Sequence, residues 1–213
     1  IVLGEGTNAR TLNITLAPFT LIGATTRVGL LTAPLRDRFH IREHLEFYTV
    51  RELAKIVIRS ARTLDVEIDE QAAMDLAGRS RGTPRVANNY LRWVRDYATA
   101  KSDGQITLDV LHAALRMADV DSIGLRREDR NYLDTLICKL DGGPAGVENI
   151  AHSMNTAVDT LEEEIEPFLL RMGLIVRTPR GRVARPAAYE QLNMAPPSPP
   201  ASGGQGNLFD PDH

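Results

Sequence analysis

The stretch GLIVRTPRGRVAR, residues 173–185, holds two short β-type segments on either side of a tight turn. Residues 174–176 and 183–184 are apolar, and residues 178–181 between them read Thr-Pro-Arg-Gly. Proline and glycine are residues that such turns favour. The stretch therefore predicts a β-hairpin with its turn at residues 178–181.

Three helical segments precede this hairpin. Apolar residues recur at helical spacing from Tyr132 to Leu140, before Gly-Gly-Pro at 142–144 ends the helix. A second helix is predicted over residues 147–154, and a third is expected to be capped by Thr156. The inward-facing residues of the third helix are Val158, Leu161, Ile165, Phe168 and Leu169. Three helices followed by a hairpin form the winged-helix pattern, so residues 122–192 are predicted to be a winged-helix domain.

The hairpin carries four arginines and no acidic residue among them. They are Arg177, Arg180, Arg182 and Arg185. Such a cationic surface suits backbone phosphates of nucleic acid, which position a protein without specifying a sequence. The alternative is a solvated arginine-rich loop, but the position after three helices favours DNA binding.

Residues 47–121 are predicted to form a small helical bundle. Each helix begins at a residue type that favours the N-cap; these residues are Thr49, Asp69, Thr83 and Thr107. Glu52 completes a capping box with Thr49. Pro84 lies at the first turn of the third helix, where its missing N–H costs nothing.

Arg85 follows in the first turn of that third helix. One interpretation is an ion pair with an acidic residue of a neighbouring helix. The other is a contact to phosphate beside a helix N-terminus, where backbone N–H groups also favour anions. The local sequence leaves both open.

Residues 1–46 are predicted to be strands. Apolar and polar residues alternate through Leu12, Ile14 and Leu16, and an apolar run then continues to Ile22. Alternation indicates a hairpin arm with one exposed face. The continuous run indicates a buried strand of the parallel type, which ends at Gly23.

The segment HIREH, residues 40–44, fits the H-x-x-E-H pattern of some zinc proteases. That pattern needs a helix to bring both imidazoles to one face. Here the segment is expected to be extended and no third ligand is evident, so no metal site is predicted.

The composition is that of a globular protein of 213 residues, with 43% apolar residues and a net charge of −3. Only three of the 25 basic residues are lysines, and arginine suits bidentate contacts to phosphate and carboxylate. The single cysteine, Cys138, fits a reducing cytoplasm. No apolar run is long enough to span a bilayer, so no membrane partner is predicted. The chain does not begin with Met and is expected to be a fragment.

Several segments together resemble the RuvB family of bacterial Holliday-junction branch-migration motors, which are AAA+ ATPases. They are FTLIGATTRVGLLTAPLRDRF, LEFY, RGTPRVANNYLRWVRDYA, GGPAGVENIA and RTPRGRVA. The resemblance covers residues 1 to about 192. It implies a mainly α fold with a partial α/β remnant: the end of a P-loop core (1–46), a helical lid (47–121), a winged helix (122–192) and a disordered tail (193–213). The chain has no G-x-x-x-x-G-K-[ST] loop and no acidic Mg²⁺ strand, so it resembles the C-terminal part of the motor. By itself it is expected not to hydrolyse ATP.

The resemblance implies roles for residues near a nucleotide. Thr25 would polarise the attacking water, and Arg38 would be an arginine finger that reaches the ATP of the neighbouring subunit in a hexamer. Arg36 would support that finger through Asp37. The family usually has Gly where His40 stands, which puts a φ > 0 turn after the finger in doubt.

The resemblance implies further roles for residues of the lid and of the wing, which is the predicted hairpin within residues 173–185. Tyr48 would lie against the nucleotide base, and Arg85 would contact phosphate from the lid. Arg177 and Arg182 match DNA-contacting wing residues, with Arg180 as a helper. The cofactors implied are ATP and Mg²⁺, whose ligands lie outside this sequence.

The partners implied are double-stranded DNA at Holliday junctions, RuvA through the hairpin of residues 1–19, other copies in a homohexamer, and RuvC in a resolvasome. The process would be recombination, repair and the SOS response, in the cytoplasm. Two alternatives stay open: a free-standing winged-helix regulator, and a non-catalytic AAA+ adaptor that supplies fingers to other subunits. Neither LRDRF nor GATT has a use in a plain regulator.

The tail is rich in Pro, Gly and Ser and cannot bury enough apolar surface to order itself. It contains QGNLF, residues 205–209, which resembles the Q-x-x-L-F peptide that binds the bacterial sliding clamp. Leu208 and Phe209 would fill an apolar pocket, and Gln205 would fix the register. The alternative is chance, because so short a motif has low specificity.

Overall fold

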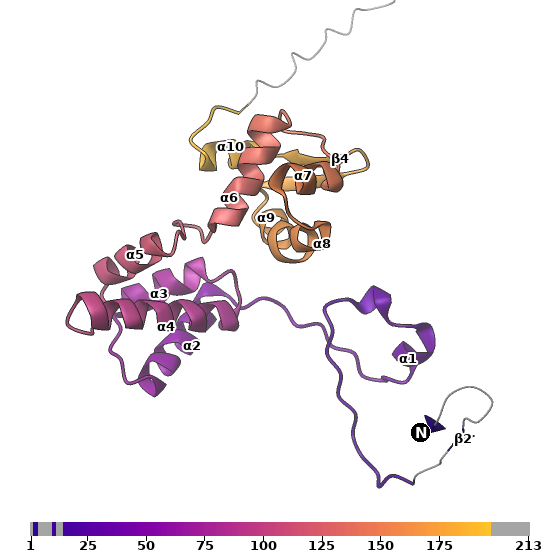
Figure 1. The fold of residues 1–213 in the computed structure, drawn as a ribbon. Helices are drawn as coiled ribbons and strands as arrows, with labels where there is room; N and C mark the ends of the chain where they lie inside the picture. The colour runs from indigo at the N-terminus through magenta and orange to yellow at the C-terminus, as the bar shows by residue number, and fades with distance from the viewer. Residues whose placement is uncertain (1, 4–9, 12–14, 197–213) are drawn as a thin grey trace, which may run out of the picture. The chain divides into compact units, whose positions relative to one another are not determined.

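The computed structural model describes residues 2–3, 10–11 and 15–196. The chain divides into two compact units, Ile1–Leu45 and Glu46–His213 (Figure 1). Within the described ranges no helix has both the length and the apolar character that a membrane crossing requires. Most of the tail, including Gln205, Leu208 and Phe209, lies outside these ranges.

The first unit contains an N-terminal strand pair and two short helical turns. The strands β1 (Val2–Leu3) and β2 (Arg10–Thr11) pair antiparallel, with Val2 opposite Thr11, as the predicted hairpin requires. A 3-10 turn, η2 (Val28–Leu30), and the helix α1 (Ala33–Asp37) follow.

The prediction of a buried strand that ends at Gly23 is wrong for the described residues of that run. Residues 15–25 are not in a strand, and the side chains of Phe19 and Ile22 are 69% and 87% exposed. Backbone N–H and C=O groups of a strand need partners, and a strand of the parallel type needs cover on both faces. Among the described residues of this unit, none forms a strand beside the run, and none covers its two faces. Leu12 and Ile14 lie outside the described residues.

The second unit begins with the predicted four-helix bundle. Its helices are α2 (Val50–Thr63), α3 (Glu70–Arg79), α4 (Pro84–Lys101) and α5 (Leu108–Met117). Each buries one apolar stripe in a shared core, which includes Leu53, Leu76, Leu91 and Leu115. The apolar residues that recur at helical spacing in the sequence therefore form the core that holds the bundle together.

The helix starts of the bundle agree with the sequence, although two caps differ in their bonding. The Thr49–Glu52 capping box is present, with Glu52 N donating to Thr49 Oγ1 and Thr49 N donating to Glu52 Oε2. Thr107 Oγ1 accepts a hydrogen bond from Val110 N, in the first turn of α5, at 3.4 Å. Asp69 and Thr83 stand at the N-cap positions of α3 and α4, but neither side chain makes a cap bond.

The winged-helix domain follows, with its own core around Tyr132, Leu136, Ile150, Leu161 and Leu169. Its first helix is α6 (Arg127–Asp134), continued by the π-helical turn η3 (Thr135–Lys139), and its second is α7 (Val147–Met154). The third consists of α8 (Val158–Thr160), the π-helical turn η4 (Leu161–Ile165) and α9 (Glu166–Arg171). The wing is β3 (Ile175–Thr178) and β4 (Gly181–Ala184), and α10 (Pro186–Gln191) follows it.

Two details of this domain differ from the sequence prediction. The N-cap of the third helix is Ala157, because the Thr156 hydroxyl donates to the Met154 carbonyl at 3.3 Å instead of capping a helix. The six-residue helix α10 was not predicted, and it packs Ala188 and Tyr189 into the domain core.

We expect Gly82→Ala to destabilise the bundle by about 1–3 kcal/mol, because Gly82 has a positive φ of 69°. An added Cβ would also lie 2.8 Å from the Cβ of Phe47. Gly78→Ala is the matched control, since nothing lies within 4 Å of its added Cβ and it stands inside α3. Chemical denaturation checks both, and equal stability of the two variants would contradict the expectation.

Candidate nucleic-acid interface and candidate nucleotide-contacting residues

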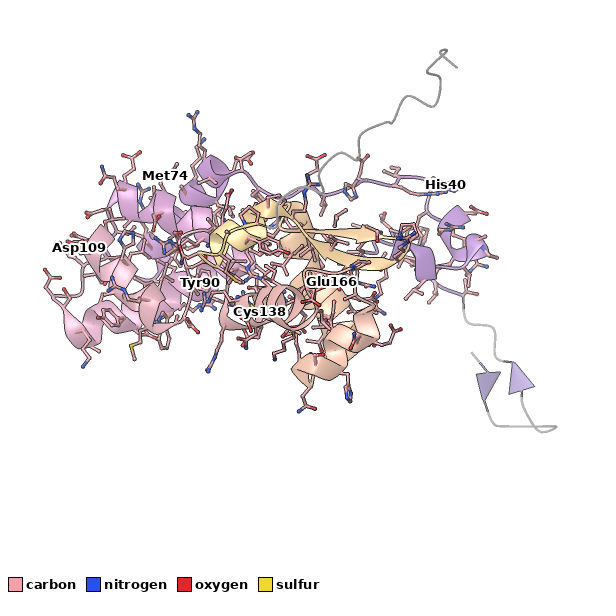
Figure 2. The ribbon with its side chains drawn as sticks, turned by 90° about the horizontal axis from the view of Figure 1, so that it is seen from above. His40, Met74, Tyr90, Asp109, Cys138 and Glu166 are labelled. Atoms are coloured by element: carbon pink, nitrogen blue, oxygen red, sulfur yellow. The ribbon has the colours of Figure 1, made fainter. Side chains whose placement is uncertain are left out.

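Two of the wing arginines converge on one buried carboxylate. Arg177 and Arg182 are directly opposite each other in the hairpin, so both side chains leave the same face. Arg177 Nε donates to Glu166 Oε2 at 2.8 Å, and Arg182 Nε donates to Glu166 Oε1 at 2.9 Å. The Tyr132 hydroxyl donates to the same Oε1 at 2.9 Å. The Glu166 side chain is fully buried beside the wing (Figure 2).

These contacts keep the carboxylate charged. Burial raises the pKa of Glu166, but the hydrogen bonds from Arg182, Arg177 and Tyr132 outweigh burial and hold the pKa below its usual value. Burial and the adjacent Glu166 raise the pKa of Tyr132, so its hydroxyl stays a donor. The result is an ionic centre that orients both guanidinium groups.

The wing is therefore less cationic than its sequence indicates. Arg182 is 13% exposed and also donates to Glu162 at 2.6 Å, whereas Arg177 is 45% exposed. Arg180 and Arg185 are exposed, and in the described part of the chain neither forms an ion pair. Sequence reasoning missed Glu166 because it lies 11 and 16 residues before its two partners. A signal was present: this acidic residue stands among the inward-facing positions of the third helix.

The predicted lid arginine, Arg85, lies on the exposed side of the first turn of α4. It forms no ion pair with any described acidic residue, so the pairing with a neighbouring helix is not observed. The Thr83 hydroxyl donates to the Arg81 carbonyl and does not cap the helix. The first N–H groups of α4 therefore have no side-chain cap, which suits an anion at this helix end.

Tyr48 lies near the same helix start. Its side chain is 47% exposed, and its backbone N–H donates to the Gly82 carbonyl at 3.0 Å. Gly82 precedes α4 by two residues, so Tyr48 and Arg85, two predicted nucleotide contacts, flank one turn of the chain.

In the first unit, the segment of Thr25 lies near the segment of Arg38. Thr25 Oγ1 accepts from Arg27 N at 3.0 Å. The ring of Phe39, the residue after Arg38, lies 3.4 Å from the position of a Cβ on Gly23. The GATT and LRDRF segments therefore adjoin.

Arg38 itself is exposed at the C-terminal end of α1. Among the described residues Asp37 pairs with Arg42 at 3.9 Å, and the expected support of the finger by Arg36 through Asp37 stays a prediction. His40 is not among the described residues with positive φ, so a side chain at this position causes no backbone strain. The HIREH segment is not helical, as expected.

The four-helix bundle followed by a winged helix, a helix-turn-helix variant, places the chain in a fold class that includes many nucleic-acid-binding domains. Three family models match the chain: the RuvB P-loop domain over residues 1–45, the RuvB AAA lid domain over 48–121 and the RuvB C-terminal winged-helix domain over 122–193. The chain belongs to the RuvB family. The family match confirms the predicted fold class.

Relatives from several bacteria are similar over nearly the whole chain. The Holliday junction branch migration complex subunit RuvB of Rhodopirellula baltica is 59% identical over 95% of this chain and 55% of its own length. That of Streptomyces avermitilis is 52% identical over 98% of this chain and 59% of its own length. The chain thus spans between half and two thirds of these relatives.

Among solved structures, the Thermotoga maritima RuvB Holliday junction branch migration motor is similar with a TM-score of 0.79. It is 46% identical and covers 84% of this chain, which in turn covers 60% of that chain.

Proposed function

We propose that the chain acts as part of a subunit of a hexameric, ATP-driven motor that moves double-stranded DNA at Holliday junctions. The observation that carries this proposal is the order of its arginines along one family-matched chain: an exposed Arg38 after α1, an exposed Arg85 at the start of a lid helix, and an arginine wing. A plain winged-helix regulator would need neither of the first two.

The residues present fit a nucleotide whose phosphates are held elsewhere. Tyr48 offers a half-exposed ring for the base, and Arg85 offers a guanidinium beside the uncapped N–H groups of α4. Bound Mg²⁺ would neutralise charge on the phosphates. Thr25 would orient the attacking water, and Arg38 would reach the nucleotide of a neighbouring subunit.

The remaining partners belong to the same proposal. RuvA would dock on the hairpin of residues 1–19, and RuvC would join the assembly at the junction. The sliding-clamp motif at Gln205, Leu208 and Phe209 stays a prediction, as does the cytoplasmic location. An in-frame phosphate-binding loop upstream of Ile1 would favour the motor over the non-catalytic adaptor.

Replacing Arg177 and Arg180 together with alanine is expected to weaken duplex DNA binding for all sequences. Because each phosphate contact releases counterions, the slope of log K against log salt should become less negative by about 0.9 per lost contact. Arg95→Ala on α4, distant in sequence from the wing, is the control. Fluorescence anisotropy over a salt series measures the effect, and a loss confined to one DNA sequence would favour the regulator.

A further inference from the structure

The turn between α3 and α4 has an unusual backbone at Arg81. This residue and Gly82 both have positive φ, 56° and 69°. A residue with a Cβ seldom adopts this conformation unless its surroundings hold it there. The turn leads directly into the start of α4, where Arg85 lies.

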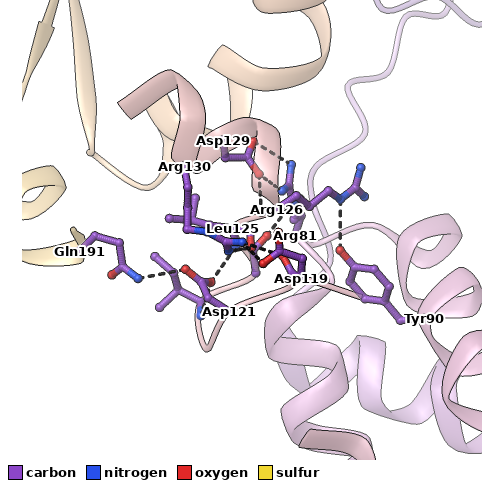
Figure 3. Close-up of polar contacts among 11 residues, drawn as sticks. Arg81, Tyr90, Asp119, Asp121, Leu125, Arg126, Asp129, Arg130 and Gln191 are labelled. Carbon is purple, nitrogen blue, oxygen red and sulfur yellow. Dashed lines mark hydrogen bonds and ion pairs between the residues drawn. The ribbon is translucent and has the colours of Figure 1, made fainter. Parts of the chain in front are cut away.

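Side-chain contacts of Arg81 to the winged-helix part of the chain hold it in place. Its Nη2 pairs with Asp129 of α6, its Nε donates to the Gly124 carbonyl at 3.0 Å, and its guanidinium lies 4.2 Å from the ring centroid of Phe168. The side chains of Arg81 and Asp129 are 9% and 2% exposed. Asp129 also accepts from Arg126 N at 2.6 Å, so its position is fixed by the start of α6 (Figure 3).

A second arginine, Arg171 of α9, holds the backbone of the same turn. Its Nη2 donates to the Arg81 carbonyl at 2.6 Å, and its guanidinium lies 3.8 Å from the ring centroid of Phe47. Phe47 packs against Gly82, and the next residue, Tyr48, donates its N–H to the Gly82 carbonyl. The turn, Phe47 and Tyr48 are therefore held as one packed group.

The helix that supplies these contacts also carries the ionic centre of the wing. Glu166, the first residue of α9, holds Arg177 and Arg182, and Phe168 and Arg171 follow on the same helix. A continuous series of packed and hydrogen-bonded residues thus runs from the wing through α9 to Arg81.

We propose that Arg81 is a positioning residue: with Asp129 and Arg171 it places the turn that holds Tyr48 and Arg85, and it couples DNA on the wing to the nucleotide. The coupling rests on the proposed function, whereas the placement of the turn does not. Because buried ion pairs are costly to break from one side, removal of either charge should release the turn.

The placement is tested on the 213-residue chain by hydrogen exchange. In Arg81→Gln and in Asp129→Asn, the Tyr48 amide should exchange at least tenfold faster than in the unaltered chain. The amide of Leu91, in the core of the bundle, should keep its rate, and Arg95→Gln should change neither. An unchanged Tyr48 rate in both variants would overturn the proposal.

The coupling is tested in the complete protein, which carries a phosphate-binding loop if the proposed function holds. Stimulation of ATP hydrolysis by duplex DNA should fall at least fivefold in each variant, while duplex affinity stays within twofold. If the two residues act through one another, the double variant Arg81→Gln/Asp129→Asn should lose no more of the stimulation by DNA than the more impaired single variant. The coupling would be overturned if the losses of stimulation in the two single variants added up in the double variant. It would also be overturned if stimulation fell in proportion to duplex affinity. A complete protein without ATPase activity would refute the proposed function and the coupling, and the exchange experiment would still decide the placement.

Discussion

If the complete protein is the proposed motor, Arg38→Ala is expected to lower its ATP hydrolysis about a thousandfold while leaving nucleotide binding within a few fold. An arginine finger neutralises the charge that develops on the phosphoryl group in the transition state, and it contributes little to the ground state. The exposed position of Arg38 at the end of α1 is consistent with a side chain that acts on another subunit. Steady-state hydrolysis and equilibrium binding of a fluorescent nucleotide measure the two effects.

Arg42→Ala is the matched control, because Arg42 is a nearby exposed arginine that pairs with Asp37. Its hydrolysis rate should stay within a few fold of the unaltered protein. Mixing Arg38→Ala subunits with subunits that lack the phosphate-loop lysine should restore part of the activity, because in the proposed hexamer one subunit would supply the finger and the other the nucleotide site. Absence of rescue at every mixing ratio would indicate that Arg38 acts within its own subunit.

Glu166→Ala is expected to destabilise the winged-helix domain by about 3–5 kcal/mol, the usual cost of removing one partner from a buried ion pair. The substitution leaves Arg177, Arg182 and the Tyr132 hydroxyl without their shared acceptor. It also removes the group that orients both arginines. Urea unfolding of the chain, followed by circular dichroism, measures the loss of stability.

Glu162→Ala is the control for this prediction, because Glu162 contacts only one of the two arginines and its side chain is 41% exposed. Exposed ion pairs contribute about 0–1 kcal/mol, so the control should be nearly as stable as the unaltered chain. Glu166→Gln should lie between the two, since an amide oxygen can still accept a hydrogen bond but carries no charge. If Glu166→Ala and Glu162→Ala lower the free energy of unfolding equally, Glu166 and its partners do not stabilise the winged-helix domain as proposed.

Local features of the fold could be predicted from the sequence because they depend on residues close together in the chain. The Thr49–Glu52 capping box and the start of α4 at Pro84 follow from spacing and residue type. The turn of the wing follows from Pro179 and Gly181 in the same way. The strand prediction before Gly23 failed because a strand depends on neighbours that local sequence does not contain.

The candidate site was predicted only in part, for the same reason. Residue type and resemblance indicated Arg38, Arg85 and the wing arginines, and the structure shows where each of these side chains lies. Periodicity could not show that Glu166 neutralises part of the wing, since its partners lie on a different element.

Residue type and spacing in the sequence were enough to indicate the main helices, most of their first residues and the wing hairpin, and the resemblance indicated the family. Which charges meet became evident only from the packing of the folded chain: Glu166 meets the wing arginines, and Arg81 meets Asp129, 48 residues away. Secondary structure arises from the spacing of residues within a few turns or strands. The partner of a buried charge depends instead on how whole elements pack, because a side chain is paired by whatever group the packing brings within hydrogen-bond reach.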